Sequence, residues 1–338
     1  MKFMAKDIGI DLGTSTTLIY VKGSGVVLNE PTVVAINDVT GEVLAVGNNA
    51  KEMLGRTPDN IIAVKPLKGG VIANFYGTRM MLEEFISKSI NKSMFSKPRV
   101  VICVPSGITD VEERAVEETA YLSGAKEVYV MEEAMAAAIG AGIKVDSPEG
   151  AMIVDIGGGT TEVAVISLGG IVASNAIRMA GDDLDKDIIE YVKDKYNVII
   201  GDNIAEEIKN TIGAAFSSMT EEKMQVKGRN LSTGLPDTIT VSTTDIETAM
   251  RRIMEEIVKL INLTLEKTPP ELAADIMEKG IVVCGGGAYI KNIDRYISNQ
   301  IGIPVVLATN PLECVARGAG TALANIEVLK KSAKNRRR

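Results

Sequence analysis

The chain has 338 residues and contains no histidine, which excludes Ser-His-Asp and Cys-His catalysis and histidine-based zinc sites. It has no tryptophan, and aromatic residues make up only 4%, so base-stacking platforms for single-stranded nucleic acid are not expected. The net charge is −7, and since the last nine residues hold six cations, the remainder carries 31 cations against 44 anions, an acidic body that argues against a nucleic-acid partner.

Two stretches of the chain share one pattern, in which a β-branched strand leads into Asp, a glycine-containing turn with hydroxyls, and a second strand. The first covers residues 8–21 and the second covers residues 152–166. Apolar runs interrupted by a short turn predict β-hairpins. Asp155 follows Asp11 by 144 residues, so we expect two related halves that open with the same hairpin.

Helical patterns lie between and after these hairpins. Residues 109–112, Thr-Asp-Val-Glu, match a capping box and predict a helix to about Ser123. Residues 132–139 are rich in alanine with acids at the start, and residues 245–266 show apolar side chains at helical spacing. Segments 32–62 and 221–244 read as short strands and turns, which we interpret as small subdomains inserted into the two halves.

A third glycine run, Gly285-Gly286-Gly287-Ala288, follows another short apolar strand. Glycine lets backbone N–H groups approach a ligand closely, and successive N–H groups in a tight turn form an anion-binding nest. Two such loops facing each other could clamp a phosphate chain, and two carboxylates beside it suit a hydrated Mg²⁺. Either loop alone could be a plain hairpin turn. The P-loop and Rossmann signatures are absent from the sequence.

At this point the chain resembles the actin, sugar-kinase and heat-shock-chaperone superfamily. Residues 11–14 and 155–160 look like the two phosphate motifs of this superfamily, and residues 285–288 look like its adenosine motif. Longer ungapped stretches resemble one family, the MreB/Mbl bacterial actins. These stretches are residues 28–36 (LNEPTVVAI), 65–73 (KPLKGGVIA), 228–236 (GRNLSTGLP) and 268–273 (TPPELA). The resemblance runs from about residue 7 to residue 328.

The resemblance implies an α/β protein with the actin-like ATPase fold. It would have two duplicated lobes with mixed sheets flanked by helices, each lobe carrying a small inserted subdomain, and a nucleotide in the cleft between them. The implied boundaries are residues 1–31, 66–143 and 314–330 for subdomain IA, 32–65 for IB, 144–180 and 245–313 for IIA, 181–244 for IIB, and 331–338 for a basic tail.

The resemblance also implies ATP and Mg²⁺ as cofactors and assigns their ligands. Asp11 and Asp155 would hold Mg²⁺ through water, and Glu206 and Lys209 would contact the ribose and adenine. The phosphates would be lined by Gly13, Thr14, Ser15 and Thr16 on one side and by Gly157, Gly158, Gly159, Thr160 and Thr161 on the other. The adenosine would be covered by Gly285, Gly286, Gly287 and Ala288.

Glu133 is the candidate for orienting the water that attacks the terminal phosphate, and Thr160 could hold the same water. Glu133 lies 22 residues before Asp155, the spacing that the family shows, at the start of a predicted helix. Phosphoryl transfer needs little more from a protein than an in-line nucleophile and charge stabilisation. A glutamate that merely favours a helix N-terminus is the alternative. The family usually has proline after this glutamate, whereas this chain has Ala134, which could loosen Glu133 and alter the rate.

The sequence predicts a cytoplasmic protein that lies peripherally at the inner face of the cell membrane. Three scattered cysteines fit a reducing compartment, and no apolar run is long enough for a membrane span. Met94 and Phe95 lie between Lys92 and Lys97, where the resembled family has its membrane-insertion loop, and the basic tail could bind anionic lipid.

The leading hypothesis is therefore an ATPase that polymerises into membrane-associated filaments, by resemblance antiparallel double protofilaments, and guides cell shape and cell-wall synthesis with membrane proteins of that process. A small-molecule kinase of the same fold is an alternative, although no separate acceptor signature is found. A chaperone-type ATPase would carry a peptide-binding domain after its nucleotide domain. A plasmid-segregating actin is disfavoured by the long MreB-like stretches.

Overall fold

The structure is a computed structural model that describes residues 7–90, 97–216 and 221–323. Its first large sheet has the strand order β10-β9-β1-β2-β3. The strands β1, β2 and β3 form an antiparallel meander, and β9 and β10 add in parallel beside β1, so the hairpin predicted for residues 8–21 is confirmed. The bounds are β1 (Asp7–Leu12), β2 (Thr16–Val21), β3 (Gly25–Pro31), β9 (Arg99–Val104) and β10 (Glu127–Glu132).

The second large sheet repeats this arrangement with the order β13-β12-β11-β17-β18. Again three strands form an antiparallel meander and two more add in parallel, so the second predicted hairpin and the duplication are confirmed. The bounds are β11 (Ala151–Ile156), β12 (Thr161–Ser167), β13 (Gly170–Ile177), β17 (Ile281–Cys284) and β18 (Val305–Leu307).

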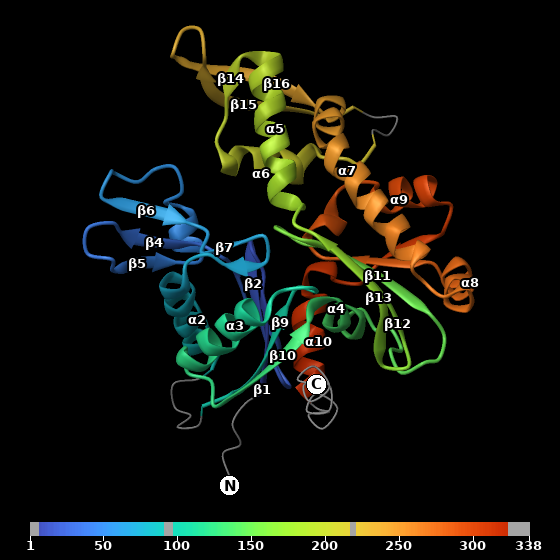
Figure 1. Ribbon diagram of the computed structural model, residues 1–338. Coiled ribbons are helices and arrows are strands. Elements are labelled where there is room, and N and C mark those ends of the chain that lie inside the picture. The colour runs from blue at the N-terminus through green and yellow to red at the C-terminus, as the bar shows by residue number, and fades with distance from the viewer. Residues whose placement is uncertain (1–6, 91–96, 217–220, 324–338) are drawn as a thin grey trace.

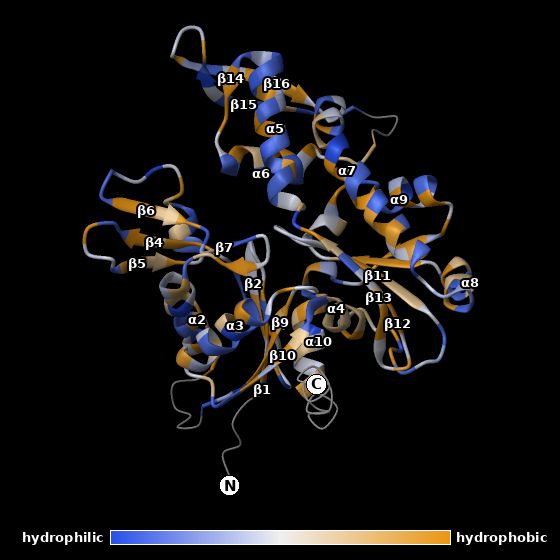
Figure 2. Cartoon of the chain, in the orientation of Figure 1, coloured by the Kyte–Doolittle hydropathy of each residue, from blue (hydrophilic) through white to orange (hydrophobic). Residues whose placement is uncertain are grey.

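Helices cover both faces of each sheet (Figure 1). One face of the first sheet packs on α2 (Phe75–Ser89) and α3 (Asp110–Leu122). The second sheet packs on α7 (Thr243–Glu266), α8 (Pro270–Lys279) and α9 (Ile293–Ile301). Alternate residues of the strands point to opposite faces, so the same strands also contribute side chains to a core between the two sheets. Figure 2 colours much of these strands as hydrophobic.

That shared core is built on α4 (Glu133–Gly140) and α10 (Cys314–Ala322). The two helices cross at backbone contact. A Cβ atom on Gly140 would lie 1.8 Å from the carbonyl oxygen of Cys314, and one on Gly318 would lie 1.8 Å from that of Ala136. Only glycine fits at both positions, which fixes the place where the chain passes from one lobe to the other.

Two small sheets lie on the same side of the molecule, one above each lobe (Figure 1). The first has the order β5-β4-β6, with β4 (Val34–Asn37), β5 (Val43–Val46), α1 (Asn48–Lys51) and β6 (Ile61–Val64), followed by the ribbon of β7 (Leu67–Lys68) and β8 (Val71–Ile72). The second has the order β14-β15-β16, with α5 (Gly181–Tyr196), β14 (Val198–Ile199), α6 (Asp202–Ile212), β15 (Lys223–Asn230) and β16 (Pro236–Ser242).

Helix starts follow the capping signals of the sequence. The capping box of Thr109 and Glu112 opens α3 as predicted. Helix α7 begins at Thr243, two residues before the predicted start, because Ser242 and Asp245 form a second capping box. Within the described ranges, no helix has the length and apolar character needed to cross a membrane.

Candidate active site

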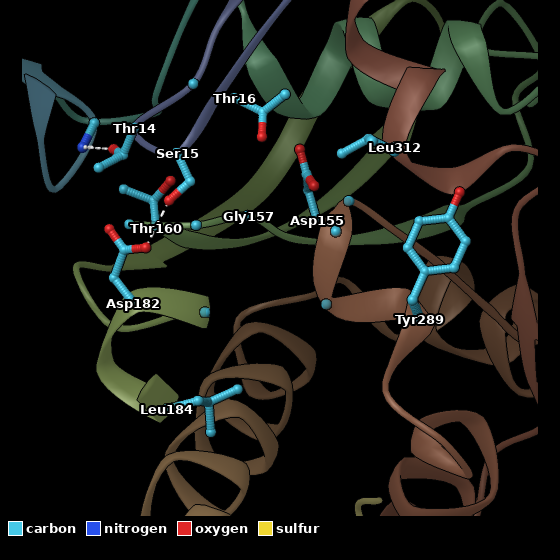
Figure 3. Close-up of a pocket in the computed structure, with 18 of the residues that line it drawn as sticks. Thr14, Ser15, Thr16, Asp155, Gly157, Thr160, Asp182, Leu184, Tyr289 and Leu312 are labelled. Atoms are coloured by element: carbon cyan, nitrogen blue, oxygen red, sulfur yellow. Dashed lines mark hydrogen bonds between the residues drawn. The ribbon is translucent and has the colours of Figure 1, made fainter. Parts of the chain in front are cut away.

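A cavity of about 230 Å³ lies between the two lobes, at the turns of the two hairpins (Figure 3). Most of the residues that the sequence predicts for nucleotide binding and hydrolysis line it together. From that set these are Asp11, Gly13, Thr14, Ser15, Thr16, Glu133, Asp155, Gly157, Gly158, Gly159, Thr160, Glu206, Lys209, Gly285, Gly286 and Gly287.

Two predicted ligands, Thr161 and Ala288, are not among the lining residues. The Thr161 side chain is fully buried, and its hydroxyl donates to the carbonyl oxygen of Met179 at 2.8 Å. Ala288 is buried in the short 3-10 turn η1 (Gly286–Tyr289), while Tyr289 beside it faces the cavity. Successive side chains of an extended strand point to opposite sides, so Thr160 and Thr161 do not both face a ligand.

The two glycine-containing turns touch each other. A Cβ atom on Gly158 would lie 2.3 Å from Ser15 Oγ, and one on Gly159 would lie 2.5 Å from Thr14 Oγ1. The Thr14 hydroxyl accepts the N–H of Gly70 at 2.9 Å. The absence of side chains at these glycines lets the hydroxyls of one lobe meet the backbone of the other across the cavity.

Four carboxyl groups, those of Asp11, Glu133, Asp155 and Glu162, gather at one part of the cavity. Burial is the main cause that raises the pKa of each, to about 6 for Asp155 and about 8 for Glu162. The pKa values of Asp11 and Glu133 lie well above the ordinary range, and the charges of neighbouring carboxylates add to the effect of burial. Such a cluster is electrostatically unfavourable without a cation.

These carboxylates fit Mg²⁺ by their chemistry. Mg²⁺ prefers oxygen ligands, keeps several waters and is usually bound through one or two carboxylates together with phosphates. Within the described residues, no three or more Asp, Glu, His or Cys side chains are placed to chelate a metal ion directly. Asp11 and Asp155 lie next to the last residues of β1 and β11, one from each lobe, and both line the cavity where a hydrated ion would sit.

Glu162 is a site residue that the sequence analysis missed. It belongs to β12, yet its carboxylate accepts the N–H of Ser106 at 3.0 Å and the Ser106 hydroxyl at 3.1 Å from the other lobe. A charged residue inside the otherwise apolar strand Thr161–Ser167 is the signal that could have revealed it.

The opposite part of the cavity carries Glu206 and Lys209 on α6, together with Asp185 of α5. Lys209 Nζ lies 2.7 Å from Asp185 Oδ1 and donates to the carbonyl oxygen of Gly181 at 2.9 Å. Burial raises the pKa of Asp185 to about 6, although the charge of Lys209 opposes this. Glu206 Oε2 accepts a hydrogen bond from Lys51 Nζ at 2.7 Å. This contact links the subdomain that contains β4, β5 and β6 to the one that contains β14, β15 and β16. Tyr289 and Leu312 also line the cavity and add apolar surface to it (Figure 3).

Residues 5–331 match the family model described as MreB/Mbl protein. The chain is 50% identical over 327 residues to the cell shape-determining protein Mbl of Bacillus subtilis strain 168, covering 97% of this chain and 98% of that one. It is 51% identical over 330 residues to the cell shape-determining protein MreB of Escherichia coli K12, covering 96% and 95%.

Solved structures agree with this likeness. MreB5 of Spiroplasma citri bound to ADP superposes with a TM-score of 0.91 at 40% identity, covering 98% of this chain and 99% of that one, and its AMPPNP complex gives the same values. The MamK double helical filament has a TM-score of 0.80 at 22% identity, covering 95% and 99%, and supports the fold alone.

Proposed function

Because the chain belongs to the MreB/Mbl family, we propose that it is a bacterial actin that binds Mg·ATP in this cavity, hydrolyses it slowly and polymerises into membrane-associated filaments. The family resemblance and the actin-like fold expected from the sequence are confirmed. The observation that carries the proposal is the meeting of two glycine turns from two duplicated lobes around one carboxylate-lined cavity.

Each wall of the cavity has a role in this proposal. Backbone N–H groups and hydroxyls of residues 13–16 and 157–160 bind the phosphates, as anion nests do. Asp11 and Asp155 would hold a hydrated Mg²⁺, which would supply positive charge beside the phosphates. Glu206 and Lys209 contact the ribose and adenine, with Asp185 holding Lys209, while Tyr289 and the turn at Gly285–287 cover the base. MreB5 of Spiroplasma citri is bound to ADP and to AMPPNP in its solved structures, which supports nucleotide binding by this chain.

Glu133 orients the attacking water with help from Thr160. The carboxylate begins α4, is buried, and lines the same cavity as Thr160 and Asp155. A carboxylate here accepts a hydrogen bond from water and aims its lone pair at the terminal phosphate. Ala134, which stands where the family usually has proline, is buried in the core. Its effect on the rate of phosphate release can be measured directly.

We further propose filaments that organise cell shape and cell-wall synthesis, with subdomains IA, IB, IIA and IIB bounded as the sequence analysis describes. The relatives are named cell shape-determining proteins, and the similar MamK structure is a filament. Head-to-tail contacts that do not close build a filament, and antiparallel pairing of two such protofilaments is the arrangement proposed here. Membrane proteins of wall synthesis and shape determination are the proposed partners.

The decisive experiment is sedimentation of the purified protein with and without Mg·ATP, run beside a phosphate-release assay. ATP-dependent pelleting with slow release of phosphate is the expected result. Absence of pelleting, with hydrolysis stimulated by a sugar or a peptide, would instead indicate a small-molecule kinase or a chaperone.

Membrane contact is proposed to come from Met94, Phe95 and the basic tail at 331–338, all of which lie outside the described residues. Cations contribute about 1 kcal/mol each at an anionic bilayer, and an apolar tip inserts beside them. The wild-type protein should co-sediment with vesicles that contain anionic lipid. A variant that combines Phe95→Ala with tail deletion should stay in the supernatant, and unchanged pelleting would contradict this assignment.

A further inference from the structure

The cavity is rich in carboxylates and poor in cations. Its described lining residues include the acids Asp11, Glu133, Asp155, Glu162, Asp182, Asp185 and Glu206, with Lys209 as the cation among them. Lys209 is already engaged by Asp185 and by the carbonyl of Gly181. A nucleoside triphosphate adds further negative charge, so its binding requires positive charge beyond that of Lys209.

The phosphate-binding turns themselves supply no cation. Residues 13–17 read Gly-Thr-Ser-Thr-Thr and residues 157–161 read Gly-Gly-Gly-Thr-Thr. Mg²⁺ offsets part of the phosphate charge, but a side-chain cation commonly completes such sites. The structure therefore has to bring that cation from another element.

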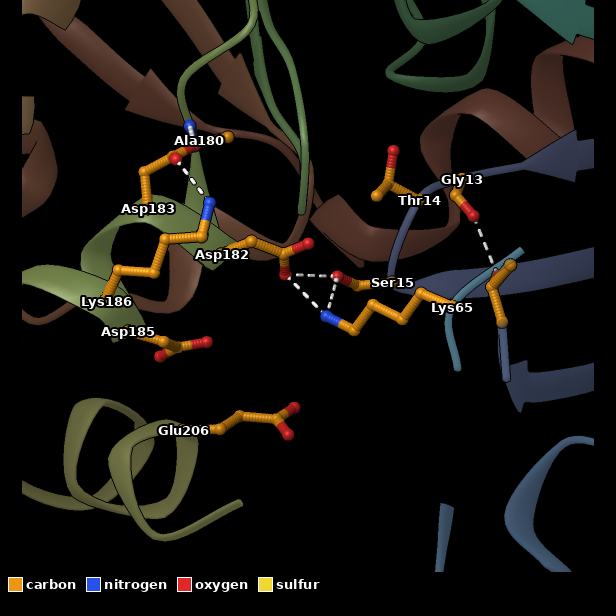
Figure 4. A network of polar contacts seen from close by, with 12 residues as sticks. Gly13, Thr14, Ser15, Lys65, Ala180, Asp182, Asp183, Asp185, Lys186 and Glu206 are labelled. Atoms are coloured by element: carbon orange, nitrogen blue, oxygen red, sulfur yellow. Dashed lines mark hydrogen bonds and ion pairs between the residues drawn. The ribbon is translucent and has the colours of Figure 1, made fainter. Parts of the chain in front are cut away.

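Lys65 is the residue in position to do so (Figure 4). It follows β6, and its Nζ lies 3.1 Å from Ser15 Oγ in the first phosphate turn and 2.8 Å from Asp182 Oδ1 in the other lobe. The Ser15 hydroxyl also donates to Asp182 Oδ1, at 2.5 Å. Asp182 thus accepts hydrogen bonds from both Lys65 and Ser15.

The Asp182 carboxylate stays stabilised when Lys65 and Ser15 bind another acceptor. It lies in the first turn of α5, where the helix dipole favours a negative charge, and its backbone N–H donates to the carbonyl oxygen of Gly158 at 2.7 Å. Its carboxylate is half-buried, and Lys65 remains accessible from solvent. Asp182 is a nearby anionic acceptor that a phosphate oxygen can replace.

We propose that Lys65 recognises the terminal phosphate of the nucleotide, and that Asp182 holds Lys65 and Ser15 when that phosphate is absent. This inference rests on the proposed function of the cavity. Lys65 and the Ser15 hydroxyl exchange the Asp182 carboxylate for phosphate oxygens, so the site distinguishes a triphosphate from a diphosphate. The competing explanation is a static strut, in which the Lys65–Asp182 ion pair simply holds the lobes together.

The two explanations differ in the sign of one effect. If Asp182 competes with phosphate, Asp182→Asn frees Lys65 and tightens triphosphate binding. If the Lys65–Asp182 ion pair only holds the lobes together, Asp182→Asn weakens triphosphate binding, as Lys65→Met does. Dissociation constants for ADP and AMPPNP, measured by calorimetry with Mg²⁺ on the full-length protein, separate the two.

We expect Lys65→Met to weaken AMPPNP by roughly tenfold, the usual size of a lost charge-assisted hydrogen bond, and ADP by much less. Lys65→Arg should retain the discrimination, and Asp182→Asn should raise the ratio of AMPPNP to ADP affinity. Lys68→Met, which removes an equal charge from an exposed position on β7, serves as the matched control and should change neither constant.

Equal weakening of both nucleotides by Lys65→Met would overturn the inference, as would weaker AMPPNP binding in Asp182→Asn. Both outcomes leave nucleotide binding by the wild-type protein intact. A wild-type protein that binds neither ADP nor AMPPNP would instead contradict the proposed function itself, so the two failures are distinguishable.

Discussion

The carboxylate of Glu162 accepts two hydrogen bonds from Ser106, one from its backbone N–H at 3.0 Å and one from its hydroxyl at 3.1 Å. Glu162 belongs to the sheet of the second lobe, and Ser106 follows β9 of the first. A buried acid therefore joins the lobes beside the carboxylates that face the nucleotide cavity.

The burial of Glu162 predicts a pH dependence of stability in the nucleotide-free protein. Burial raises the pKa of Glu162 to about 8, whereas an unfolded glutamate titrates near 4.3. Between these values the folded state binds more protons than the unfolded state, so the free energy of unfolding falls as the pH rises from about 5 to 8. We expect a loss of roughly 1–3 kcal/mol over this range.

Thermal melts in EDTA at pH 6 and pH 8 measure this effect. Glu162→Gln should flatten the dependence, because its amide oxygen can still accept the Ser106 N–H and its amide can donate to the hydroxyl, but it does not titrate. An unaltered slope in this variant would place the responsible proton elsewhere.

Gly158→Ala should impair nucleotide binding while leaving the fold intact. The added Cβ would lie 2.3 Å from Ser15 Oγ and 2.5 Å from Ser15 Cβ, so the two phosphate turns must separate. Overpacking of this kind costs about 1–3 kcal/mol, which corresponds to an increase of roughly 5- to 150-fold in the dissociation constant for ADP.

Gly201→Ala is the matched control for this substitution. Nothing lies within 4 Å of the Cβ it would add, and the Gly201 backbone has an ordinary negative φ of −89°. Its nucleotide affinity and melting temperature should stay near those of the wild type. Equal affinities for the two alanine variants would show that the turns can accommodate a side chain.

Glu133→Ala should keep nucleotide binding and abolish phosphate release. The side chain is buried in the cavity wall but lies on the residue that begins α4, where alanine is also a good helix former. We expect the rate of phosphate release to fall by at least about 10² while the ADP dissociation constant changes by less than about threefold. Loss of ADP binding in this variant would indicate a structural role for Glu133.

Asp245→Asn should destabilise the subdomain that contains β14, β15 and β16. The buried Asp245 carboxylate accepts Lys195 Nζ, the Tyr196 hydroxyl at 2.6 Å and the Tyr191 hydroxyl at 3.1 Å, and it caps α7. Burial alone would raise the pKa of Asp245, but these donors outweigh it and lower the pKa to about 2. We expect a loss of about 2 kcal/mol at pH 7.

The sign of its pH dependence follows from the lowered pKa. Stability from the ionised Asp245 is present above its unfolded pKa of about 4 and is lost as the pH falls towards 2. Denaturant unfolding at pH 7 and pH 3 should therefore show a smaller difference between wild type and variant at pH 3. Asp59→Asn, at an exposed position, should be near neutral.

Local features of the fold were predictable because local chemistry determines them. The hairpins at residues 8–21 and 152–166 follow from β-branched runs broken by glycine turns, and the capping box of Thr109 and Glu112 opens its helix where expected. Spacing between the two hairpins also indicated the duplication, which the two sheets confirm.

Contacts between distant segments could not be predicted in this way. Lys65 and Asp182 are 117 residues apart, and although Lys65 opens a stretch that resembles the MreB/Mbl family, no sequence pattern pairs it with Asp182. The family resemblance implied that Thr161 lies at the phosphates together with Gly157 to Thr160, but strand alternation turns its side chain into the core. Such orientations depend on which elements pack together, and the sequence pattern alone does not specify them.

The crossing of α4 and α10 has a mechanical consequence. Carbonyl oxygens of one helix occupy the space that a side chain would fill on Gly140 and Gly318 of the other, so the helices cannot slide past each other. The two helices therefore form one rigid block within the core that the two large sheets share. The two small sheets lie away from this block, on the same side of the molecule (Figure 1). The ion pair of Lys51 and Glu206, which joins the subdomains of these small sheets, is thus a second tie between the lobes at a distance from the shared core.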